Sequence, residues 1–91
     1  MVIMSRMFTV RYSKQAIKAL RKMPGGIAKK MQSAMLEIAK QPAVYKGDWK
    51  RLEGTDFWRL RIGGWRAVCA VLDGELVILV VKVAPRGDVY K

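Results

Sequence analysis

A basic hairpin with a diglycine turn constrains the fold of this chain more than any other feature. Over Phe57–Ile62, apolar side chains recur at every second position, which is typical of a strand with one buried face. Gly63-Gly64 follows, and adjacent glycines supply the positive φ angles that a two-residue hairpin turn requires. A turn of that length predicts that Arg61 faces Arg66 on the returning strand.

The basic side chains of this hairpin gather on one face of the predicted sheet. Arg59 lies two residues before Arg61, so strand alternation places it on the same face as the pair of Arg61 and Arg66. Like charges that face each other destabilise a strand pair. Because the planar fork of arginine suits phosphate oxygens, three guanidinium groups here predict a site for a polyanion. The alternative is that they only solubilise an exposed sheet face.

The charge and composition set the class of protein. Eighteen Lys and Arg against seven Asp and Glu give 91 residues a net charge of +11, which indicates a nucleic acid, an acidic protein partner, or both. With 52% apolar residues, the chain can form one modest core, and its single cysteine cannot form an internal disulfide. We therefore expect one domain spanning residues 1–91 in a reducing cytoplasm. The amino-terminal segment is too short and weakly apolar for a signal peptide or membrane span.

The reactive residue types narrow the chemistry. Without histidine, the chain can assemble neither a convincing transition-metal site nor a serine or cysteine triad, and we expect no metal and no cofactor. Cys69 lies in an apolar strand and is interpreted as a packing residue. Glu53 and Asp56 are candidates for a carboxylate pair. We favour instead a salt bridge to a neighbouring cation, Lys50 or Arg51.

The first half of the chain predicts a strand followed by two helices. Residues 7–12 alternate like a strand, and Ser13 is a plausible N-cap for a first helix. Pro24-Gly25-Gly26 ends that helix, and so short a break predicts an antiparallel second helix over residues 27–40. Its apolar stripe, which includes two methionines, is interpreted as core.

The second half predicts strands. Residues 49–53 are a possible short strand, and Asp73-Gly74 predicts a second hairpin turn between strands over 67–72 and 76–83. The last of these is so continuously apolar that we expect a central strand covered on both faces. The two helices should cover one face, and something else should shield the other, in part or at times. Together these segments predict an α+β fold, with a helical hairpin on one face of a twisted, mainly antiparallel sheet of about four strands.

Leu52, Gly54, the run 57–66 and the closing Arg86-Gly87-Asp88-Val89-Tyr90 resemble the RelE-type toxins of the RelE/ParE superfamily, from bacterial type II toxin–antitoxin systems. The resemblance covers nearly the whole chain, including the order strand, helix, helix, sheet. It implies an mRNA interferase that cleaves messenger in the ribosomal A site. The implied chemistry is attack of a ribose 2′-hydroxyl on the adjacent phosphate without a metal.

The resemblance also implies roles for individual residues. Arg66 matches the family's transition-state arginine, Arg86 the arginine that protonates the leaving oxygen, and Tyr90 the tyrosine that stacks on or orients the substrate. The best-studied members carry lysines where this chain has Arg59 and Arg61, and one of those lysines is the proposed general base. Arginine is effectively never deprotonated, so we expect this pair to stabilise charge, which leaves the base unassigned.

The same resemblance implies macromolecular partners. An acidic antitoxin, helical or extended, would wrap the domain in a heteromeric complex and cover apolar surface. Two alternatives stay open: a ParE-like inhibitor of DNA gyrase, which needs no phosphate-cleaving arginines, and an RNA-binding module that never cleaves. Basic residues outside the hairpin are predicted to bind RNA, those on the helices by docking on ribosomal RNA through counterion release. These are Lys18, Arg21, Lys22, Lys29, Lys30, Lys50 and Arg51.

Overall fold

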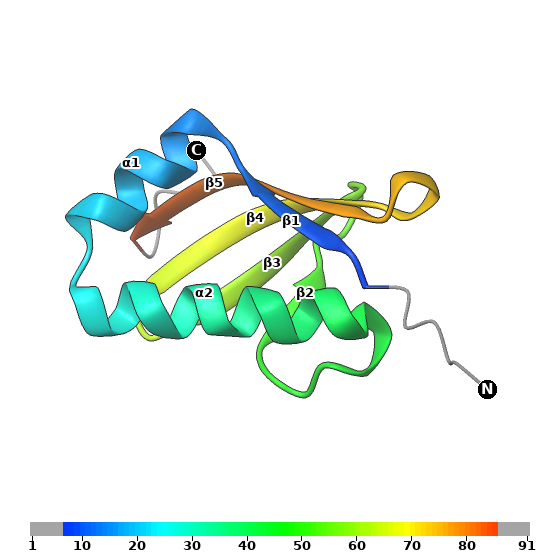
Figure 1. The fold of residues 1–91 in the computed structure, drawn as a ribbon, viewed down its shortest axis with the longest axis horizontal. Coiled ribbons are helices and arrows are strands. Elements are labelled where there is room, and N and C mark those ends of the chain that lie inside the picture. Colours follow the sequence, from blue (N-terminus) through cyan, green and yellow to red (C-terminus); the bar gives the residue numbers. More distant parts are fainter. Residues whose placement is uncertain (1–6, 86–91) are drawn as a thin grey trace.

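The computed structural model describes residues 7–85, which form two helices on one face of a five-stranded sheet (Figure 1). The strand order is β1-β5-β4-β3-β2, with β1 parallel to β5 and every other neighbouring pair antiparallel. The α+β prediction is confirmed, with one strand more than the four or so expected. The elements are β1 (Thr9–Tyr12), α1 (Lys14–Lys22), α2 (Gly25–Lys40), β2 (Trp49–Arg51), β3 (Phe57–Ile62), β4 (Trp65–Leu72) and β5 (Val77–Pro85), with 3-10 turns at Pro42–Val44 and Asp73–Glu75.

The predicted N-cap of the first helix is confirmed. The Ser13 hydroxyl accepts a hydrogen bond from the Ala16 amide at 3.1 Å and donates one to the Val81 carbonyl at 2.6 Å. The same side chain therefore starts α1 and ties that helix to β5. The cap satisfies one of the backbone N–H groups that every helix start leaves without an intrahelical partner.

The break between the helices is shorter than predicted. Both glycines of the Pro24-Gly25-Gly26 segment lie in the first turn of α2, and the Pro24 carbonyl accepts from the amides of Ile27 and Ala28. Proline suits a helix start because it has no N–H to satisfy there. The chain does reverse, but α2 runs back at an oblique angle to α1 (Figure 1). It contacts β1 and β3, whereas α1 lies against β5.

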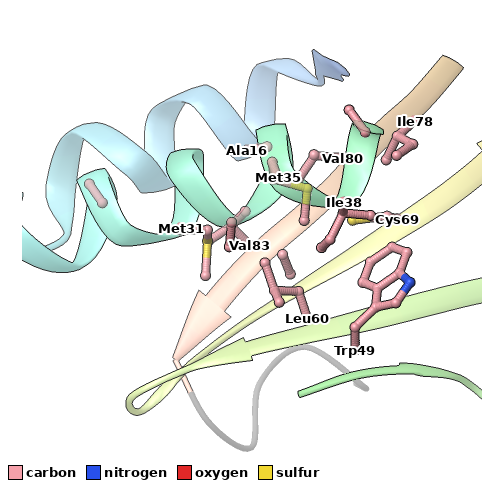
Figure 2. Close-up of a cluster of buried hydrophobic side chains, with 14 of the residues drawn as sticks. Ala16, Met31, Met35, Ile38, Trp49, Leu60, Cys69, Ile78, Val80 and Val83 are labelled. Atoms are coloured by element: carbon pink, nitrogen blue, oxygen red, sulfur yellow. The ribbon is translucent and has the colours of Figure 1, made fainter. Parts of the chain in front are cut away.

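The core lies between the helices and the sheet (Figure 2). The apolar stripe of α2 is confirmed as core, because Met31, Met35 and Ile38 are fully buried against strand residues such as Leu60. Cys69 is also buried, and burial raises the pKa of its thiol to about 12. Its thiol is therefore protonated at neutral pH, which agrees with the predicted packing role.

The two predicted hairpin turns agree with the structure to different degrees. The β3–β4 register is as predicted, with Arg61 opposite Arg66, although only Gly63 of the diglycine has a positive φ, of 58°. The second predicted hairpin is present, because β4 and β5 pair antiparallel, but its connection is not a two-residue turn on Asp73-Gly74. The chain instead makes a 3-10 turn over Asp73–Glu75, and Leu76 adopts the left-handed conformation at φ 53°. The connection is therefore longer than two residues.

The face of the sheet opposite the helices is called the open face here. β5 is central, as predicted, but within residues 7–85 neither helix covers its open-face side, and Val77 and Leu79 are only half-buried there. Among residues 7–85, the helices cover one face of this strand, as expected, and a cover for its other face stays a prediction. Val81 is an extra residue of β5 opposite the step from Val68 to Cys69 in β4, and this bulge keeps the buried side chains of both strands facing the helices.

Candidate functional site

The open face carries the three arginines that the sequence singled out. Arg61 and Arg66 face each other across the β3–β4 hairpin, and residues opposed in this way have Cα atoms about 5 Å apart. One step further from the turn, the next open-face row runs Lys50–Arg59–Val68–Lys82 across four strands. Five basic side chains thus occupy two adjacent rows of the open face.

A carboxylate lies among these arginines. Asp48, directly before β2, accepts a hydrogen bond at Oδ1 from Nη2 of Arg59 at 2.6 Å and one at Oδ2 from Nε of Arg61 at 2.7 Å. Partial burial raises the pKa of Asp48, but the bond from Arg61 and the charges of Arg59, Arg61 and Lys50 outweigh it and hold this pKa below its ordinary value. Asp48 is therefore ionised and bridges two guanidinium groups.

The three arginines differ in access to solvent. Arg59 is 8% exposed as a residue, so its guanidinium is held inside the protein with its charge compensated by Asp48. The Arg61 side chain is 44% exposed, and Arg66 is half-buried. A large ligand on the open face can therefore contact Arg61 and Arg66. Arg59 is too buried for direct contact and can influence such a ligand only through its charge.

The tail candidates Arg86 and Tyr90 lie outside the described residues. The last described residue, Pro85, pairs with Trp65, and Ala84 pairs with Arg66. Arg86 therefore directly follows a strand whose end is in register with the start of β4.

The predicted RNA-binding residues do not form one surface. All are exposed, but five lie on α1 and α2, across the sheet from the open face, whereas Lys50 is on the open face. Arg51 lies opposite Trp58 in the sheet, and Trp58 packs against the core. The Arg51 guanidinium forms an ion pair with Asp56 at 3.3 Å. The salt-bridge interpretation of Asp56 is thereby confirmed. The five helix residues are Lys18, Arg21, Lys22, Lys29 and Lys30.

Sequence reasoning missed Asp48, which lies directly before the possible strand over residues 49–53. The signal that reveals it is the strand register: Trp49 pairs with Leu60, so the residue before Trp49 falls opposite Arg61. The Arg61 amide indeed donates to the Asp48 carbonyl at 3.0 Å. This contact requires the β2–β3 pairing, which residues 49–53 indicate only weakly in the sequence.

Two further observations concern the described part of the chain. Residues 7–85 contain no group of three or more His, Cys, Asp or Glu side chains arranged to hold a metal ion. Neither of the helices in that range is long and apolar enough to cross a membrane.

Comparisons with known proteins agree on the class. The family profile described as the ParE toxin of a type II toxin-antitoxin system, parDE, matches residues 10–90. The protein named "Putative toxin RelE1" of Methanocaldococcus jannaschii is 33% identical over 86 residues, covering 92% of this chain and 96% of that protein.

Solved structures share the fold. The archaeal RelE–RelB complex from Pyrococcus horikoshii OT3 matches with a TM-score of 0.78 and 29% identity, over 90% of this chain and 98% of that one. The isolated RelE toxin of E. coli matches with a TM-score of 0.74 and 23% identity, over 91% of this chain and 90% of that one.

Together, the fold and these similarities define a toxin of a type II toxin–antitoxin system. The chain belongs to the ParE toxin family, within the RelE/ParE superfamily. Its individual relatives are RelE-like, so the resemblance drawn from the sequence motifs is confirmed.

Proposed function

We propose that this toxin is a ribosome-dependent endoribonuclease that cleaves messenger RNA and so inhibits translation. The observation that carries the proposal is the opposition of Arg61 and Arg66 on an open sheet face, with Arg61 held by Asp48. Cleavage of a phosphodiester builds negative charge on the phosphate oxygens and on the leaving 5′ oxygen. Preorganised guanidinium groups stabilise charge of this kind where it develops.

The proposed reaction is an internal transfer within the RNA. The ribose 2′-hydroxyl loses its proton and its oxygen attacks the adjacent phosphorus, while the bond to the 5′ oxygen breaks and that oxygen gains a proton. Arg66 and Arg61 contact the phosphate. Arg86 guides the proton to the leaving oxygen, and Tyr90 stacks on or orients a base, as the resemblance implies. The reaction, as proposed, needs neither a metal nor a cofactor.

The partners follow from the charge and from the relatives. Structures of relatives contain RelE together with RelB, and a chain of charge +11 attracts an acidic protein. We propose a cognate acidic antitoxin that forms a heteromeric complex with a single toxin domain spanning residues 1–91, in the cytoplasm. Exposed apolar side chains of the open face, such as Phe57 and Leu72, supply surface for it to cover.

A second candidate is inhibition of DNA gyrase. The observation that favours it is the matching family profile, whose description names ParE. Such a toxin shares the fold but needs no arginines that stabilise a cleaved phosphate. The two candidates therefore differ in their dependence on Arg66.

The experiment is single-turnover cleavage of A-site messenger on programmed ribosomes, with mapping of the messenger ends. Wild-type protein should produce new messenger ends within the A-site codon. The Arg66→Ala variant should produce these ends more slowly. Arg11→Ala is the matched control, because Arg11 is an exposed open-face arginine on β1, opposite Leu79 rather than in the arginine rows. Intact messenger together with gyrase-linked DNA breaks would favour the second candidate. Messenger that is bound but uncut, without such breaks, would indicate an RNA-binding module.

A further inference from the structure

The Asp48 carboxylate binds two arginines at once, with one oxygen for each. Oδ1 lies 2.6 Å from Nη2 of Arg59, and Oδ2 lies 2.7 Å from Nε of Arg61. The backbones of Asp48 and Arg61 are also hydrogen-bonded, since the Asp48 carbonyl accepts from the Arg61 amide at 3.0 Å. Three contacts therefore fix Asp48 against β3.

These contacts fix the direction of the Arg61 guanidinium. The five N–H groups of a guanidinium form a rigid planar fork, so holding Nε–H also orients the terminal nitrogens. Within residues 7–85, no other hydrogen bond of the Arg61 guanidinium is present, and the side chain is 44% exposed. Its terminal N–H groups are thus held in place and accessible from the open face.

Arg59 makes the arrangement rigid. Its side chain is only 10% exposed, and a buried charge is strongly unfavourable unless it is paired. Moving the Asp48 carboxylate toward Arg61 or away from it would leave the Arg59 charge uncompensated. Arg59 therefore anchors Asp48, and Asp48 in turn anchors Arg61.

We propose that Asp48 is a positioning residue that sets the cleavage rate by orienting Arg61, without contacting the RNA. The inference rests on the proposed nuclease function. Asp48 is poorly suited to be the missing general base, because both carboxylate oxygens already accept charge-assisted hydrogen bonds. The lowered pKa of Asp48 also makes this carboxylate a weak proton acceptor.

The proposal separates binding from chemistry. Replacing Asp48 by asparagine removes a negative charge beside the arginines and raises the net charge one unit above +11. Electrostatics alone then predicts equal or tighter binding of ribosome and RNA. The rate at saturation should fall, because Arg61 is no longer oriented for the transition state. A fold defect would instead reduce the amount of active protein, and with it the apparent binding.

The first test is single-turnover cleavage as a function of toxin concentration. Asp48→Asn should lower the saturated rate by about 10- to 100-fold without weakening half-saturation, since small misplacements of catalytic groups can have effects of that size. Glu37→Gln is the matched control, because it removes the same charge from an exposed ion pair, with Lys40 at 3.3 Å. That control should cleave at the wild-type rate. A wild-type rate for Asp48→Asn would overturn the proposal.

The second test asks whether Asp48 acts through Arg61. In an Arg61→Ala background, adding Asp48→Asn should slow cleavage less than about twofold further, because no Arg61 guanidinium remains to be oriented. Full additivity would overturn the proposal. The saturated rate of Asp48→Asn should also fall by the same factor across the pH range. Loss of a pH-dependent limb would instead identify Asp48 as the base.

A third measurement does not depend on cleavage. In ¹H–¹⁵N spectra of wild-type protein, the Nε–H signal of Arg61 should exchange slowly with water, and Asp48→Asn should abolish that protection. If wild-type protein cuts no messenger, the proposed function fails, whereas this spectrum still tests the contact. If Asp48→Asn does not fold, Asp48→Glu replaces it. That variant keeps the net charge but displaces the carboxylate, so a saturated rate equal to wild type would contradict the proposal.

Discussion

Arg61 and Arg66 occupy directly opposed positions on β3 and β4, where like charges destabilise an antiparallel pair. A carboxylate beside the neighbouring strand offsets part of this repulsion. Asp48, directly before β2, forms ion pairs with both Arg61 and Arg59. Among residues 7–85, the two rows hold five basic side chains, and Asp48 pairs with two of them. The open face therefore keeps a positive field suited to phosphate groups.

The ion pairs of Asp48 predict a pH-dependent stability. The pKa of Asp48 is lower in the folded chain than its ordinary value, so the folded state binds this proton more weakly than the unfolded state. The stabilisation is then complete above about pH 4 and is lost as the pH falls further, through the folded-state pKa. The difference in unfolding free energy between wild type and Asp48→Asn should shrink between pH 7 and pH 3. An equal or larger difference at pH 3 would contradict this assignment.

The core predicts a contrast between two leucines. Leu60 on β3 is 0% exposed and packs beneath α2, whereas Leu36 on α2 is 52% exposed. Leu60→Ala should lower the unfolding free energy by about 2–5 kcal/mol, because it removes buried surface and leaves a cavity. Leu36→Ala should change it by no more than about 0.5 kcal/mol. Chemical denaturation of both variants measures the contrast, and equal losses would disprove this description of the core.

The capping serine predicts a second contrast. Ser13→Ala removes the N-cap bond to Ala16 and the bond to the Val81 carbonyl, so it should destabilise the protein by about 1–2 kcal/mol. Ser33 lies on the exposed side of α2, where alanine is the better helix former. Ser33→Ala should be neutral or slightly stabilising in the same thermal-unfolding experiment. A Ser13→Ala variant as stable as wild type would rule out the link between α1 and β5.

The helix lysines predict an effect on binding without an effect on chemistry. Replacing Lys18, Lys22, Lys29 and Lys30 by glutamine lowers the net charge from +11 to +7, on the side of the sheet away from the arginines. Ribosome binding should weaken, and its dependence on salt should become shallower, because fewer counterions are released. Cleavage by saturating toxin should stay near the wild-type rate. Unchanged binding would show that these helices do not face the ribosomal RNA.

Much of the structure could be predicted from local patterns in the sequence. The opposition of Arg61 and Arg66 follows from strand alternation and a short turn, which involve only neighbouring residues. The same holds for the Ser13 cap and for the buried stripe that contains Met35. Hydrophobic period and turn chemistry are sufficient wherever the contacts lie close together along the chain.

The features that could not be predicted depend on contacts between residues far apart in the sequence. Asp48 meets Arg59 and Arg61 only because β2 pairs with β3, and no short-range pattern announces that pairing. The burial of Arg59 likewise depends on this partner. At the other hairpin, the sequence favoured a turn on Asp73-Gly74, but Leu76 takes the left-handed conformation instead, which leucine rarely adopts. Such outcomes depend on the whole sheet rather than on the segment itself.

The role of Arg66 is the central claim, and single-turnover cleavage of A-site messenger on programmed ribosomes tests it most directly. With each variant confirmed as folded, Arg66→Ala should cleave about 10²–10³-fold more slowly than wild type, the scale typical of losing one preorganised donor. Arg66→Lys should recover little, because a point charge cannot reproduce the guanidinium fork. Cleavage by Arg66→Ala at the wild-type rate would contradict the arginine-centred mechanism.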